Sequence, residues 1–149
     1  MAETLGMLCD KLTIVKLKQY HTTDEKRQES LTKQAILLQQ EIDGYVSAAI
    51  NGLIPLQNLT FASNKVYKKE GNEIEEKSGD LGELFSQLAD INCKLWHEVE
   101  KGYDIENIPV YEKDHLIKSL AVLNLERNMV IDKIDITFCG LIANQKINE

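Results

Sequence analysis

Polar side chains interrupt the apolar faces of three segments whose spacing predicts α-helices. When residues are placed at about 100° per position, Asn92 lies in the middle of one apolar face, and Trp96 and Glu100 follow at four-residue steps. Asp10 lies within an apolar face of another segment. A third segment carries four polar residues within an arc of roughly 100° on its apolar side, namely Asn124, Arg127, Asn128 and Asp135. We therefore predict that a guanidinium, several amides and carboxylates meet in the core.

Arg127 needs a carboxylate partner if it is buried. An unpaired buried charge costs several kcal/mol, whereas a charge that is paired and hydrogen-bonded is tolerated. Asp10, Glu100 and Asp135 are the candidate partners. Asp135 follows on the same helix at a rise of about 12 Å, which is too far for a direct pair. We therefore expect Arg127 to pair with Asp10 or Glu100 across a helix interface.

Two interpretations of these polar residues stay open. They form a structural network that fixes the register of the helices, as buried amides do in coiled coils. Alternatively, they line a ligand pocket in which a guanidinium, amides and an indole recognise a phosphate, a carboxylate or a sugar. In either case Asn124 and Asn128, as i, i+4 neighbours, are placed to bridge to Asp135 or Asn92. One helix face carries more polar groups than are needed to fix the register of the helices. The pocket interpretation is therefore kept beside the structural one.

Four helical segments carry or support these residues, and no stretch alternates with period two for long enough to predict a sheet. Short connections between long helices favour antiparallel neighbours, so the sequence predicts an all-α antiparallel bundle. The first expected helix covers about residues 4–20 with Thr4 as N-cap, and the second runs from Thr23 or Asp24 to the stop signals Gly52 and Pro55. The third runs from Ser78 or Asp80 to Lys101 and is stopped by Gly102. The fourth covers about residues 110–136, and residues 137–149 are expected to continue it.

The first helix is expected to be buried between the others because it is apolar on two opposite faces. Leu5, Leu8 and Val15 lie on one of these faces, and Ile14 and Leu17 lie on the other. The segment near 64–79 is expected to be a mobile loop, because glycines and a run of glutamates interrupt any apolar pattern there.

The composition excludes several classes of protein. A chain of 149 residues with few glycines and prolines predicts one folded domain over residues 1–149. The net charge of −7 argues against binding to nucleic acid or anionic lipid. No apolar stretch reaches the roughly 18 residues of a membrane span. The first residues lack the pattern of a secretory signal. The three cysteines are widely spaced, which predicts reduced thiols. We therefore expect a cytoplasmic location.

Metal and cofactor chemistry has little support in the sequence. Glu112 and His115 have the ExxH spacing of di-iron bundles, but such a site needs a second ExxH motif and further inward glutamates. We therefore expect no metal and no cofactor. Asp132 and Asp135 have a DxxD spacing, which keeps open an alternative function. In this alternative the protein is a metal-dependent nucleotide or nucleotide-sugar hydrolase that uses Glu100, Asp132 and Asp135.

Three segments resemble a family of small, uncharacterised, all-helical bacterial proteins. Residues 4–14, TLGMLCDKLTI, are similar to the family's GELxDKLTIL start, residues 91–100 to its N-x-x-L-W-x-x-E-D stretch, and residues 123–135 to its N-x-x-R-N-x-x-I-x-x-I-D stretch. The three motifs occur in the same order and cover three of the four expected helices.

The resemblance implies a recurring set of residues and a biological setting. The set is Asp10, Lys11, Asn92, Trp96, Arg127, Asn128 and Asp135. Genes of the family are often found among those for lipopolysaccharide and other surface-glycan synthesis, which is an association without a mechanism.

Together these observations predict an accessory or small-ligand-binding protein of surface-glycan metabolism, with no catalysis assigned. The expected ligand is an anionic or sugar-containing small molecule, and a helical adaptor that acts by forming homo-oligomers is a further alternative. The candidate ligand-binding residues are Asp10, Lys11, Asn92, Trp96, Glu100, Asn124, Arg127, Asn128 and Asp135.

Overall fold

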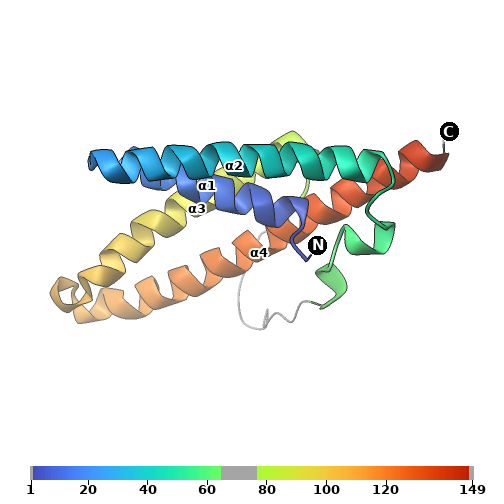
Figure 1. Ribbon diagram of the computed structural model, residues 1–149. Coiled ribbons are helices and arrows are strands. Elements are labelled where there is room, and N and C mark those ends of the chain that lie inside the picture. Colours follow the sequence, from blue (N-terminus) through green and yellow to red (C-terminus); the bar gives the residue numbers. More distant parts are fainter. Residues whose placement is uncertain (1, 65–76, 148–149) are drawn as a thin grey trace.

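Four long helices make up the bundle in the computed structural model, which describes residues 2–64 and 77–147 (Figure 1). They are α1 (Leu5–His21), α2 (Glu25–Ile50), α3 (Leu81–Tyr103) and α4 (Val110–Ile147). Short 3-10 turns lie at Leu56–Asn58, Ala62–Asn64 and Ile105–Asn107. Within the described ranges no strand occurs, so the predicted all-α bundle is confirmed. Most of the loop predicted near 64–79 lies outside the described residues.

The helix boundaries agree with the sequence prediction at the starts, and the end of the third helix differs. Thr4 caps α1 by accepting the N–H of Met7, and Asp24 caps α2 by accepting the N–H of Arg27 at 2.9 Å. The prediction that Gly102 stops the third helix was wrong, because α3 continues to Tyr103. Residues 137–147 do continue α4, as the apolar spacing of the tail indicated.

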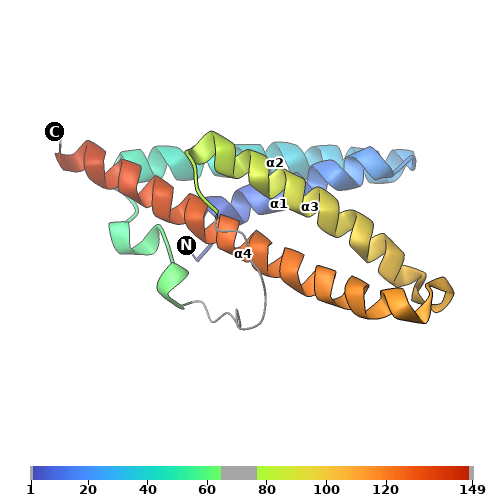
Figure 2. The same cartoon turned by 180° about the vertical axis from the view of Figure 1, so that it is seen from behind.

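Helix α1 lies in the middle of the bundle and contacts all three other helices. Figures 1 and 2 show α2 along one side of it, and α3 and α4 as a second antiparallel pair on the other side. The expected burial of the first helix between its neighbours is therefore confirmed. Among the described residues, no helix combines the length and the apolar character that crossing a membrane requires. The core side chains from the four helices include Leu8, Val15, Leu38, Leu84, Leu88, Val130 and Ile134.

Gly6 brings the backbones of α1 and α4 into close approach. Its N–H donates to the buried carboxylate of Asp135 at 2.7 Å. A Cβ atom added at Gly6 would lie 2.6 Å from the carbonyl oxygen of Ile131 and 2.9 Å from Asp135 Oδ1. Because the first of these atoms belongs to a helix backbone, it has little freedom to move away. A side chain at position 6 would therefore push α1 off α4.

We predict that Gly6→Ala lowers the free energy of unfolding by about 2 kcal/mol, because overpacking adds to the strain on a buried hydrogen bond. Urea denaturation followed by circular dichroism measures this change. Gly44→Ala is the matched control: it lies inside α2 with nothing within 4 Å of an added Cβ, and should raise stability by up to about 1 kcal/mol. A Gly6→Ala protein as stable as the wild type would contradict the close approach.

Tyr45 on α2 is a buried phenol in the core. Its side chain is packed beside Phe138, its residue is 2 % exposed, and within the described residues its hydroxyl has no hydrogen-bond partner. Burial, with a contribution from the charge of Asp135, raises the pKa of Tyr45 to about 12. The unfolded chain loses this proton near the ordinary value of 10.0, so the folded state loses stability as the pH rises from there toward 12.

We predict that Tyr45→Phe leaves stability at pH 7 unchanged or raises it by up to about 1 kcal/mol, because the buried hydroxyl is lost together with its desolvation penalty. The variant should also lose less stability than the wild type between pH 7 and about 10.5. Urea midpoints at the two pH values test both statements. Tyr20→Phe at an exposed position is the control and should retain the wild-type pH response. An equal loss in Tyr45→Phe would contradict the assignment.

Candidate functional site

Asp10 is the centre of a polar cluster that joins three helices. The residue is 5 % exposed, and its carboxylate accepts hydrogen bonds from Arg127 Nε at 2.9 Å and Arg127 Nη2 at 2.5 Å. Asn92 Nδ2 donates to the same carboxylate at 2.9 Å. Asp10 comes from α1, Asn92 from α3 and Arg127 from α4. The prediction that Arg127 pairs across a helix interface is confirmed, and Asp10 rather than Glu100 is the partner.

The geometry of this pair is that of a strong ion pair. Both carboxylate oxygens of Asp10 face the guanidinium in the bidentate arrangement that favours arginine over lysine. The hydrogen bond to Asp10 raises the pKa of Arg127, against the opposing effect of burial. The Arg127 side chain is still 28 % exposed, so the cluster has one side open to solvent.

A groove lies over this open side, between α1, α3 and α4. It has a volume of about 430 Å³. Its polar lining includes five of the residues predicted from sequence: Asn92, Trp96, Glu100, Asn124 and Arg127. Its apolar walls are Ile14, Leu17, Leu95, Val99, Tyr103 and Leu120. We refer to this cavity as the groove. An apolar cavity with a few convergent polar groups is typical of small-molecule sites.

Trp96 is held at the rim of the groove by two contacts. Its indole Nε1 donates to Glu100 Oε1 at 2.5 Å, one turn further along α3. Its ring stacks on His21 at the end of α1, with centroids 4.7 Å apart and an interplanar angle of 22°. Sequence reasoning missed His21, because this contact joins an exposed residue of α1 to a half-buried one of α3 and leaves no trace in the spacing of either helix.

Three of the predicted site residues lie elsewhere. Lys11 forms an exposed ion pair with Glu3, and this hydrogen bond raises its pKa. Asn128 Nδ2 donates to the main-chain oxygen of Asn124 at 2.9 Å, so this hydrogen bond runs within α4 instead of forming the expected bridge to Asp135 or Asn92. Asp135 accepts the N–H of Gly6, as described above. It therefore anchors α1 to α4 separately from the Asp10 cluster.

The groove contains no obvious metal site. In residues 2–64 and 77–147, no three His, Cys, Asp or Glu side chains come together in a way that could hold a metal ion. Glu100 and Asp135, which the hydrolase alternative uses, bind Trp96 and Gly6 respectively. Cys9, next to Asp10, is a thiol whose pKa is raised to about 11, chiefly by burial and further by the charges of Asp135 and Asp10. A thiol of this kind stays protonated at neutral pH and is a poor nucleophile.

Comparison with models of known families, with curated proteins and with solved structures returned no match to this chain. The family resemblance and the association with glycan synthesis therefore stay predictions.

We predict that Arg127→Leu lowers the free energy of unfolding by about 3 kcal/mol, because it leaves Asp10 buried without its cation. The double variant with Asp10→Leu should lose less than the sum of the two single losses, with a coupling of about 1–3 kcal/mol. Urea denaturation of all four proteins measures this cycle. Lys118→Leu removes an exposed cation from α4 and should change stability by less than about 0.5 kcal/mol. If Arg127→Leu behaves like this control, the pair is not a structural requirement.

Proposed function

We propose that the protein binds a small molecule in the groove, with a sugar-containing polar part against the Asp10 cluster. One observation carries this proposal: the apolar walls open onto an ordered, partly exposed guanidinium instead of closing over it. A network that served only to fix helix register would be expected to be enclosed. A partly exposed one presents oriented donors and acceptors to a ligand.

The charges around the groove favour a polar, uncharged group over a highly charged anion. Among the described residues, Arg127 is the one cation that lines it, and its charge is balanced by its ion pair with Asp10. Glu100 adds a carboxylate at the rim. The formal sum over these three groups is negative, which disfavours a free phosphate at this point. Sugar hydroxyls both donate and accept hydrogen bonds, so they suit a mixture of carboxylate, amide and guanidinium.

Two amides and the indole complete the binding chemistry. Asn92 uses its amide nitrogen on Asp10, which fixes the orientation of its side chain. Asn124 is exposed at the groove wall, and its main-chain oxygen accepts from Asn128. Trp96 supplies an apolar wall against which the C–H face of a sugar ring can pack. In this proposal Arg127 and the two asparagines orient the ligand, and Glu100 keeps the indole in place.

The adaptor alternative also has an observation in its favour. Large apolar side chains are exposed around the turn between α3 and α4, including Tyr103, Val110, Tyr111 and Ile117. Tyr103 also lines the groove, so this patch continues the groove's apolar surface outward. We favour the small-molecule proposal because the apolar surface leads to a polar cluster, whereas an interface between copies needs no such cluster. Self-association stays a hypothesis.

We predict that a monosaccharide from a panel of D-glucose, D-galactose and N-acetylglucosamine raises the midpoint of thermal unfolding. A ligand at a hundred times its dissociation constant stabilises the folded state by about 2.7 kcal/mol. Trp96 is the only tryptophan in the chain and lines the groove, so its fluorescence is expected to respond to a ligand bound there. Asn124→Ala should weaken binding roughly tenfold, which is the loss expected for one or two ligand hydrogen bonds.

Asn144→Ala is the matched control for this experiment. It removes an exposed amide from α4 outside the groove and should bind like the wild type. If no sugar of the panel changes the unfolding midpoint or the fluorescence, the sugar proposal is wrong. Equal weakening by Asn124→Ala and Asn144→Ala would also place the ligand somewhere other than the groove.

A further inference from the structure

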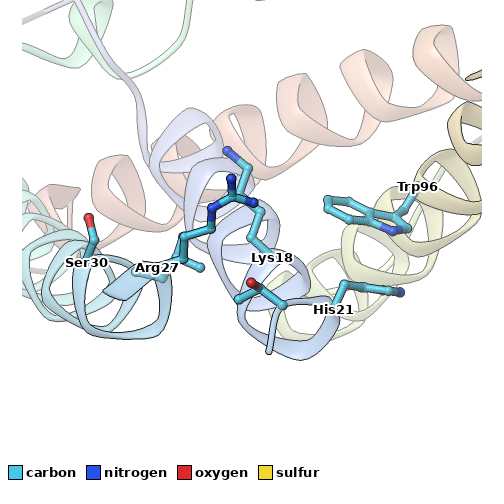
Figure 3. Close-up of a pocket in the computed structure, with 7 residues that line it drawn as sticks. Lys18, His21, Arg27, Ser30 and Trp96 are labelled. Atoms are coloured by element: carbon cyan, nitrogen blue, oxygen red, sulfur yellow. The ribbon is translucent and has the colours of Figure 1, made fainter. Parts of the chain in front are cut away.

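A second pocket lies where α1 ends and α2 begins, and Figure 3 shows the side chains around it. It has a volume of about 410 Å³ and takes its walls from three helices and the α1–α2 turn. We call it the cationic pocket, defined by Lys18, His21, Thr22, Arg27, Ser30, Leu31 and Trp96. Trp96 lines both this pocket and the groove, so the two cavities meet at the indole.

Two cations point into this pocket in a chain that carries a net charge of −7. Lys18 comes from the last turn of α1 and Arg27 from the first turns of α2, and in Figure 3 both head groups extend toward the same side of the pocket. The ion pairs found among the described residues use Lys11, Lys77, Lys101 and Arg127 as cations, and neither Lys18 nor Arg27 takes part in them.

Three acidic residues, Asp24, Glu25 and Glu29, lie close to Arg27 in sequence, and none of them lines the pocket. Asp24 accepts the main-chain N–H of Arg27 as the cap of α2, so its carboxylate is directed at the helix end. Two like charges that converge without a carboxylate between them repel each other. An anion bound between them would replace this repulsion by two charge-assisted contacts.

Neutral donors lie beside the two cations. Thr22 Oγ1 accepts the N–H of Asp24 at 3.3 Å, so its hydroxyl proton is available to a ligand. Ser30 contributes a second hydroxyl from α2. His21 Nδ1 lies 2.9 Å from the carbonyl oxygen of Leu17, which can only accept, so this nitrogen carries a proton and orients the ring against Trp96. The pocket thus offers several donors, and its described lining contains no carboxylate.

We infer that the cationic pocket binds a phosphate monoester group, and that the ligand of the groove is therefore a phosphorylated sugar. The guanidinium, the ammonium and the hydroxyls match the charge and the several acceptor oxygens of such a group better than those of a planar carboxylate. The link to the groove rests on the proposed function and on Trp96 as the wall common to both cavities. The anion site itself rests on the lining of the cationic pocket, chiefly Lys18 and Arg27, and is independent of the proposed function.

The test measures binding of inorganic phosphate, D-glucose 1-phosphate and D-glucose by Trp96 fluorescence and by calorimetry. Lys18→Ala and Arg27→Ala should each weaken binding of both phosphate-containing probes about tenfold or more, because each removes a charge-assisted contact. Lys26→Ala is the matched control: it removes a cation next to Arg27 that does not line the pocket, and it should bind like the wild type.

The source of the phosphate group is tested separately. Phosphatidylcholine vesicles with and without phosphatidic acid present the same headgroup chemistry on a surface. Binding of the soluble phosphates, lost in Lys18→Ala and Arg27→Ala and kept in Lys26→Ala, supports the inference. Binding to the phosphatidic acid vesicles alone, equal weakening in all three variants, or no binding of any phosphate probe overturns it.

The groove and the pocket can fail independently. Asn124→Ala should weaken the binding of glucose 1-phosphate without changing the binding of inorganic phosphate. Lys18→Ala should weaken the binding of both. If inorganic phosphate binding depends on Lys18 but glucose 1-phosphate binds no more tightly than inorganic phosphate, the anion site stands and the link between the cavities is wrong. Binding of D-glucose itself then decides the sugar proposal. Glucose binding that depends on Asn124, with no phosphate binding at all, leaves the proposed function intact and removes the anion site.

Discussion

The carboxylate of Asp10 is the interaction on which the rest of the structure depends. It is buried, and it receives two hydrogen bonds from Arg127 and one from Asn92. A buried carboxylate is tolerated only when such partners surround it. Because the partners come from α3 and α4, the requirement of this one group holds three helices in a single arrangement. The apolar core can then pack in only one register.

A second contact determines how α1 crosses α4. The N–H of Gly6 donates to Asp135. On α1, Gly6 lies about one turn before Asp10, and on α4, Arg127 lies about two turns before Asp135. These two anchors hold the N-terminal half of α1 against α4. The C-terminal half, which carries Ile14 and Leu17, lines the groove. The groove is therefore a consequence of where the anchors lie, since both are at the same end of α1.

The helices and the central ion pair could be predicted from sequence, and the reasons are physical. Apolar spacing reports which face of a helix is buried, and the penalty for an unpaired charge left Arg127 few partners. Contacts that depend on how two helices are oriented carry neither signal. The stacking of His21 on Trp96 and the convergence of Lys18 and Arg27 depend on the angle between helices, which periodicity does not encode. Asp135 and Arg127 share one helix face, so the sequence predicts one cluster for both. In the structure Asp135 contacts Gly6 and Arg127 contacts Asp10, one turn further along α1.

The distribution of charge explains why the two cavities suit different parts of one ligand. Arg127 is half-buried, but Asp10 neutralises it and Glu100 adds a carboxylate, so the groove attracts hydroxyls more than anions. Lys18 and Arg27 are more exposed, yet no ion pair among the described residues uses them. A cation already paired with a carboxylate contributes little net field, whereas an unpaired one contributes its full charge, reduced by solvent screening. The strongest attraction for a phosphate therefore lies in the cationic pocket, which shares Trp96 with the groove.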